Sequence, residues 1–214
     1  MKRYAMQHLI EWKEDPGHLP MIIRGARQVG KTWLMKEFGR TEFEKYAYIN
    51  FDRNSRMKQL FSGDFDVDRI LRGLSIESEV EIAPEDTLII LDEIQEVPAA
   101  LQSLKYFCED DRQRYNIVAA GSLLGISMHE GTSFPVGKVD SMDLYPLSFT
   151  EFLDATGNGQ LVSLLEQQDF DMITAFKDKY IDLLKTYYYV GGMPAAVNAY
   201  LPKQNLNSVR RVQK

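Results

Sequence analysis

One stretch of eight residues constrains the fold of this chain more than any other feature of its sequence. The stretch begins at Gly25 and ends at Thr32, reads GARQVGKT, and matches the pattern G-x-x-x-x-G-K-[ST]. It lies between an apolar strand pattern, Met21-Ile22-Ile23, and a helical pattern from Lys31 to Phe38. Glycines let the backbone curl so that its N–H groups point at phosphate oxygens, and the positive end of the helix adds to the attraction. The stretch therefore predicts a phosphate-binding loop between a strand and a helix.

The pattern also assigns roles within this loop. Backbone N–H groups would hold the phosphates of a nucleotide. The Lys31 ammonium would reach the β- and γ-phosphates, and the Thr32 hydroxyl would bind Mg²⁺. The predicted nucleotide-binding residues are Gly25, Ala26, Arg27, Gln28, Val29, Gly30, Lys31 and Thr32.

A second motif follows the continuous apolar run Thr87–Leu91, where Asp92 and Glu93 stand side by side. Such a run is typical of a strand buried on both faces of a parallel sheet, and ligands bind at the carboxyl ends of these strands. Asp92 would hold the magnesium ion through water. Glu93 would act as the general base that polarises the water attacking the γ-phosphate. Acidic residues also end strands as turn formers, but the upstream loop favours the catalytic interpretation.

Another strand pattern, Tyr115–Ala120, leads to Gly121 and Ser122. The Ser122 hydroxyl would lie at the same sheet edge as Asp92, where it could hydrogen-bond the γ-phosphate or the attacking water. A plain turn residue is an equally good interpretation of Ser122.

Alternating strand and helix patterns predict an α/β fold with a mainly parallel sheet. After residue 157 only helical spacing is found. We therefore expect a phosphate-binding core over residues 1–157 and a helical segment over 158–214 that starts a second domain, most of which is missing. Further strands are expected at Tyr46–Phe51 and Val139–Leu144, and helices around Met57, around Val67–Leu74, from Pro98 to about Asp110 and from Phe149. Gly39 is expected to follow the end of the first core helix.

Composition argues against several classes of function. The formal net charge of −6 gives no general reason to expect nucleic-acid binding. No apolar run approaches the roughly 20 residues that span a bilayer, and the N-terminus lacks the apolar region of a signal peptide, so we expect a cytoplasmic protein. The three histidines have no partners at zinc-ligand spacing. The single cysteine, Cys108, lies in a helical pattern and is expected to be buried.

Taken together, these motifs resemble those of the AAA+ ATPases. More narrowly, they are similar to a large prokaryotic group of predicted AAA+ ATPases whose ATPase domain precedes a second domain of unknown function. The resemblance runs from Arg3 to Gln213, and its motifs are Arg24–Thr32, Leu91–Gln95, Gly121-Ser122, Leu144–Phe149 and the apparent junction Gly191–Pro194.

The resemblance implies a P-loop NTPase fold of AAA+ type with sheet order 5-1-4-3-2. It also implies ATP as the nucleotide, Mg²⁺ as its metal ion, and Ser122 in the position called sensor 1. The partner would be an unidentified protein or the missing C-terminal domain, and an oligomer is left open.

One departure from the family concerns the arginine finger, a basic residue offered to a neighbouring subunit. Lys138 stands where related sequences have arginine, and lysine lacks the planar two-pronged donor. Arg112 and Arg114 are the alternative basic residues near this edge of the sheet, and a surface residue without a finger role is the favoured interpretation of each of the three.

Three functions follow from these observations. The first is an ATPase whose cycle moves an attached domain or partner, supported by Glu93 beside Asp92. The second is a slow nucleotide-dependent switch, supported by the lysine at position 138. The third is a P-loop kinase, against which stands the absence of an arginine-rich lid segment after the core.

Overall fold

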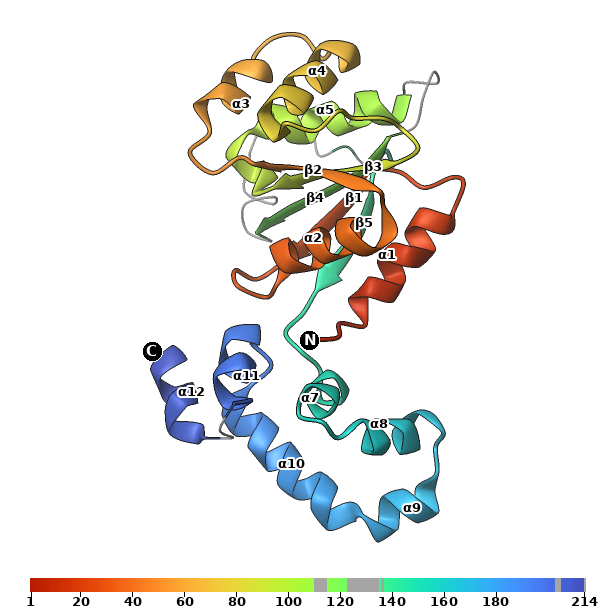
Figure 1. Cartoon of the computed structure of the whole chain (residues 1–214), viewed down its shortest axis with the longest axis vertical. Coiled ribbons are helices and arrows are strands. Elements are labelled where there is room, and N and C mark those ends of the chain that lie inside the picture. The colour runs from red at the N-terminus through yellow and green to blue at the C-terminus, as the bar shows by residue number, and fades with distance from the viewer. Residues whose placement is uncertain (110–114, 123–134, 136, 203–204, 214) are drawn as a thin grey trace. The chain divides into compact units, whose positions relative to one another are not determined.

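The computed structural model describes residues 1–109, 115–122, 135, 137–202 and 205–213 (Figure 1). Arg112 and Arg114 lie outside the described residues. The chain divides into two compact units. One unit comprises Ala5–Leu144 and is called here the α/β unit; the other comprises Met1–Tyr4 and Tyr145–Lys214 and is called the helical unit. The domain boundary expected after residue 157 remains a prediction.

The α/β unit is built on a parallel sheet (Figure 1). Within the described residues the sheet has five strands in the order β2-β3-β4-β1-β5, and every neighbouring pair is parallel. Read from the opposite edge, this order is the expected 5-1-4-3-2, so the fold predicted from sequence is confirmed. The strands are β1 Met21–Gly25, β2 Lys45–Asn50, β3 Thr87–Asp92, β4 Asn116–Ser122 and β5 Asp140–Leu144.

Helices cover both faces of this sheet because successive side chains of a strand point to opposite sides. On β3, Leu88 and Ile90 pack on the side of α1 Ala5–Glu14 and α2 Lys31–Glu42. Ile89 and Leu91 pack on the other side, where the helices are α3 Ser55–Leu60, α4 Val67–Ser78 and α5 Pro98–Glu109 (Figure 1). All six residues of β3 are buried, which is the physical reason for the continuous apolar run in its sequence.

Two local expectations were wrong in detail, and one helix was not expected. Helix α2 continues through Gly39 to Glu42. Glycine is needed inside the helix because a Cβ at position 39 would come within 3.0 Å of Tyr46 ring atoms. No element was expected near the N-terminus, where α1 forms with Leu9 and Trp12 buried. Cys108 lies on α5 but is half-buried rather than buried.

The helical unit contains short helices, and among the described residues no helix is long and apolar enough to cross a membrane. Its two small apolar clusters centre on Phe152 with Val197 and on Leu161 with Tyr180. The helices are α7 Phe149–Ala155, α8 Gly159–Glu166, α9 Phe170–Ala175, α10 Lys177–Val190, α11 Pro194–Tyr200 and α12 Leu206–Val212.

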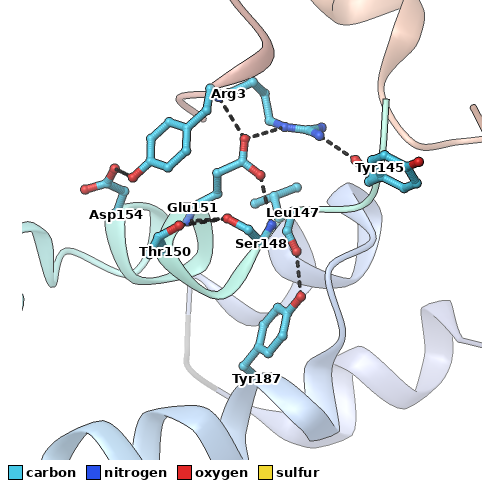
Figure 2. A network of polar contacts seen from close by, with 9 residues as sticks. Arg3, Tyr145, Leu147, Ser148, Thr150, Glu151, Asp154 and Tyr187 are labelled. Carbon is cyan, nitrogen blue, oxygen red and sulfur yellow. Dashed lines mark hydrogen bonds and ion pairs between the residues drawn. The ribbon is translucent and has the colours of Figure 1, made fainter. Parts of the chain in front are cut away.

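A buried polar network joins the N-terminal segment of the helical unit to α7 (Figure 2). The Arg3 guanidinium lies 3.0 Å from the Glu151 carboxylate, and both side chains are at most 7% exposed. Arg3 also donates to the Tyr145 carbonyl at 2.6 Å, and Glu151 accepts the backbone N–H of Tyr4 at 2.8 Å. Glu151 further caps its own helix by accepting the Ser148 N–H at 2.9 Å. One carboxylate thus fixes both the first residues of the chain and the start of α7.

Candidate functional site

The loop from Gly25 to Thr32 connects the end of β1 to the start of α2. Gly30 precedes α2 with φ 101° and ψ 19°, a left-handed conformation that glycine adopts at little cost. Its carbonyl accepts the N–H of Leu34 at 2.9 Å, which starts the helix. Gly25 lies against β5, where a Cβ would overlap the Leu144 carbonyl oxygen. Both glycines of the motif therefore have a conformational or packing reason to be glycine.

Lys31 is the first residue of α2, and its side chain folds back over the loop. Its ammonium group donates to the carbonyl oxygens of Gly25 and Ala26, each at 2.9 Å, and the residue is only 6% exposed. Burial lowers the pKa of the Lys31 ammonium, and the nearby carboxylates of Glu93 and Asp92 oppose this shift. The charge therefore lies inside the loop, where phosphate oxygens could replace the carbonyl acceptors.

The loop and the acidic end of β3 meet directly. The Thr32 hydroxyl donates to Oδ2 of Asp92 at 2.7 Å, and Asp92 is 2% exposed. The backbone N–H of Glu93 donates to the other carboxylate oxygen, Oδ1, at 3.1 Å. A hydroxyl and a carboxylate are the hard oxygen ligands that Mg²⁺ prefers, so this pair fits the expected metal ion.

Glu93 occupies an unusual backbone conformation at the end of β3. Its φ of 55° and ψ of 42° lie in the left-handed region, which non-glycine residues adopt rarely. Its side chain is partly buried and accepts a hydrogen bond from the Gln95 amide at 2.6 Å. Gln28 in the loop and Arg53 near the end of β2 also have positive φ. Such strain tends to gather at functional sites.

Ser122 is the last residue of β4, and its register partner on β1 is Gly25, the first residue of the loop. Asp92 ends the neighbouring strand β3. The structure therefore brings Ser122, the loop and Asp92 to the same edge of the sheet.

A polar cavity of about 560 Å³ opens beside these groups. Four of its lining residues were predicted from the sequence: Arg27, Thr32, Asp92 and Glu93. The others were missed and are Tyr48, Asn50, Asp52, Arg53 and Glu96. Three of these five lie at or just after the carboxyl end of β2, the kind of position where ligands gather in such sheets, so the predicted strand could have identified them.

Tyr48 gave no such signal, because its role depends on its neighbours in space. Its hydroxyl donates to Oδ2 of Asp92 at 3.0 Å. Burial, followed by the charge of Asp92 and the hydrogen bond to it, raises the pKa of Tyr48 to about 12. The hydroxyl therefore keeps its proton and remains a donor at physiological pH.

Lys138 is half-exposed, and its ammonium lies 3.1 Å from the Glu109 carboxylate. It is not among the residues that line the cavity. The described structure thus pairs this lysine with a neighbouring side chain of the same unit.

The sheet order and the loop joined to β3 define a P-loop NTPase fold of the AAA+ type. A family model described as "AAA domain" matches residues 18–153, well over half of the chain. The chain belongs to this AAA domain family. Among curated proteins, no sequence matches the chain significantly.

Solved structures show the same fold over nearly the whole chain. The Walker-type ATPase PABY2304 of Pyrococcus abyssi has 14% identity and a TM-score of 0.55, covering 99% of this chain and 70% of that protein. AMPPCP-bound DnaA from Aquifex aeolicus has 16% identity and a TM-score of 0.51, covering 99% and 65%. PCH-2 of C. elegans has 15% identity and a TM-score of 0.51, covering 98% and 66%. At these identities the likeness concerns the fold, and the chain spans 65–70% of the length of these proteins.

Proposed function

We propose that this chain binds ATP with Mg²⁺ in the polar cavity and hydrolyses it, and that hydrolysis moves an attached domain or partner. The observation that carries the proposal is the 2.7 Å hydrogen bond between Thr32 and Asp92. It joins two motifs that lie far apart in the sequence, one suited to phosphates and the other to a magnesium ion and a water nucleophile. AMPPCP bound to the similar fold of DnaA supports an adenine nucleotide.

Binding would use the loop and its lysine. The backbone N–H groups of the loop would surround the phosphates, helped by the positive end of α2. Lys31 would exchange its acceptors on Gly25 and Ala26 for oxygens of the β- and γ-phosphates. Because its ammonium is already buried in the loop, little rearrangement of the side chain is needed.

Thr32 and Asp92 would hold the metal ion, Thr32 through its hydroxyl oxygen and Asp92 through water. When bound, Mg²⁺ would neutralise negative charge on the phosphates. Asp92 suits this role because burial and its hydrogen bonds fix the carboxylate in one orientation.

Glu93 would take the proton from the attacking water. Its carboxylate lines the cavity one residue beyond Asp92, and the Gln95 amide orients it through the 2.6 Å hydrogen bond. Ser122 would donate to the γ-phosphate or to the same water from the end of β4. General-base catalysis of this kind is worth about 10²–10⁴-fold in rate.

The slow switch is a second candidate, and the ion pair between Lys138 and Glu109 favours it. A lysine held by a neighbouring carboxylate is poorly suited to act as a finger. In that case the chain would bind ATP tightly and turn it over rarely.

Phosphate release by wild-type protein and by Glu93→Gln, at saturating Mg·ATP, tests the proposal. We expect the variant to bind ATP as the wild type does. Its rate of ATP hydrolysis should be lower by a factor of about 100 or more. Glu85→Gln is the matched control, since it makes the same charge change at an exposed residue just before the start of β3. This variant should keep wild-type turnover.

Two results would change the conclusion. If the wild type binds ATP but hydrolyses it no faster than Glu93→Gln, the slow nucleotide-dependent switch would replace the ATPase that moves a domain or partner. Transfer of labelled γ-phosphate to an acceptor other than water would instead identify a kinase.

A further inference from the structure

The Asp92 carboxylate has a second hydroxyl neighbour that no phosphate-binding motif predicts. Strands β2 and β3 pair in parallel, with Asn50 opposite Asp92 and Tyr48 opposite Ile90. Tyr48 therefore lies two residues before the level of Asp92 and on the same side of the sheet, because side chains alternate along a strand. Its hydroxyl reaches Oδ2 of Asp92 at 3.0 Å.

Helix α2 holds Tyr48 from its other side. Thr32 and Lys36 stand one helical turn apart, so they lie on the same face of α2. Thr32 donates to Oδ2 of Asp92, the atom that also accepts the Tyr48 hydroxyl. The Lys36 ammonium lies 3.5 Å from the centroid of the Tyr48 ring, a close cation–π contact. Tyr48 is thus fixed between α2 and the end of β3.

The acceptor positions of Asp92 are nearly filled by these donors. A carboxylate offers about four lone-pair positions. Oδ2 accepts from the hydroxyls of Thr32 and Tyr48, and Oδ1 accepts from the backbone N–H of Glu93. Two donors on Oδ2 leave little room for a metal ion to bind that oxygen directly, but they fix the plane in which the carboxylate faces the cavity.

We propose that Tyr48 is a positioning residue for the magnesium site, holding the Asp92 carboxylate in the orientation that receives the ion through water. This inference rests on the proposed function, since it concerns the ion bound with ATP. The Tyr48 hydroxyl contacts Asp92 rather than the nucleotide. Its loss should weaken the magnesium dependence of binding and leave the phosphate contacts of the loop in place.

The experiment measures the affinity of a fluorescent, non-hydrolysable ATP analogue as a function of free Mg²⁺. Tyr48→Phe removes one oxygen and keeps the ring under Lys36. We expect the Mg²⁺ concentration at half-maximal effect to rise about tenfold, the lower end of the loss seen when an outer partner of a metal ligand is removed. Affinity in EDTA, without Mg²⁺, should stay within about twofold of wild type, which also shows that the variant is folded.

Tyr46→Phe is the matched control, because Tyr46 lies two residues earlier on the same face of β2 and does not line the cavity. Its magnesium dependence should equal that of wild type. An unchanged midpoint in Tyr48→Phe would overturn the inference and leave the proposed function standing. Parallel loss of affinity with and without Mg²⁺ would also overturn it, since it would show a merely structural role. A wild-type protein whose nucleotide binding ignores Mg²⁺ would overturn the proposed function itself.

Discussion

The two units of this chain use their residues differently. In the α/β unit, apolar side chains fill both faces of the sheet, and the polar groups concentrate at one edge around Asp92. In the helical unit, α9 has no buried residue, and large apolar side chains such as Phe170 and Tyr188 are 68% and 76% exposed. Its best-defined feature is the buried ion pair of Arg3 and Glu151. The α/β unit is thus organised around a polar site at one edge of its sheet. The helical unit is organised around the Arg3–Glu151 ion pair, called here the anchor.

If this separation is correct, substitutions in the two units should have different consequences. Changes at the site should alter nucleotide binding with little effect on the helical unit. Changes at the anchor should loosen the helical unit and leave the site intact.

The largest effect on nucleotide binding is expected from Lys31→Ala. The variant loses the charge that would contact the β- and γ-phosphates, and each charge-assisted hydrogen bond is worth about 1.5–3 kcal/mol. Affinity for ATP, measured by titration calorimetry, should fall about 100-fold or more. Retained micromolar binding would show that the nucleotide binds elsewhere.

A matched pair of glycines gives the next prediction. A Cβ at Gly25 would overlap the Leu144 carbonyl in the α/β unit, and one at Gly192 would overlap the Leu147 carbonyl in the helical unit. Alanine at either position should cost about 1–3 kcal/mol of stability, measured by denaturant unfolding, because the backbone must shift. Only Gly25→Ala should also weaken nucleotide binding. Equal loss of binding in both variants would contradict the separation of the units.

The anchor predicts an effect confined to the helical unit. Arg3→Ala leaves the Glu151 carboxylate buried without its cation, which costs about 3–5 kcal/mol. Hydrogen exchange should speed up across α7 and its neighbours while the amides of the sheet stay protected. Lys185→Ala is the control, because its pair with Asp182 is more than 70% exposed on both sides and should change nothing measurable. Faster exchange in both units would mean that they unfold together.

The smallest effect is expected from Lys138→Ala. A true finger is worth about 10³–10⁵ in kcat. Since Lys138 is half-exposed and paired with Glu109, its removal should change the rate of ATP hydrolysis by less than about twofold. A thousandfold loss of turnover would instead show that Lys138 acts as a finger residue.

The sheet order and the phosphate loop could be predicted because their signals are local. Glycines at fixed spacing indicate a backbone that must curl, and the continuous apolar run of β3 indicates burial on both faces of the sheet. The same logic placed Asp92 and Ser122 at strand ends, and the structure brings both to the edge where the loop lies.

What sequence reasoning missed depends on register and on contacts between distant segments. Tyr48 reaches Asp92 only because β2 pairs with β3 in one register. Arg3 and Glu151 are 148 positions apart in the sequence, and no pattern near Arg3 predicts a buried partner. Gly39 was wrongly predicted to follow a helix end. A glycine that is needed inside a helix, here for the close approach of Tyr46, cannot be distinguished in the sequence from a glycine that ends one.

The most direct test of the account is hydrogen exchange of the wild-type chain with and without Mg·ATP. Bound nucleotide should slow exchange at the loop amides from Ala26 to Thr32 and at Glu93, all within the α/β unit. A nucleotide site at this edge of the sheet therefore predicts protection at the loop and at the end of β3. Slower exchange confined to residues 145–202, or no change at the loop, would contradict a nucleotide site at this edge of the sheet.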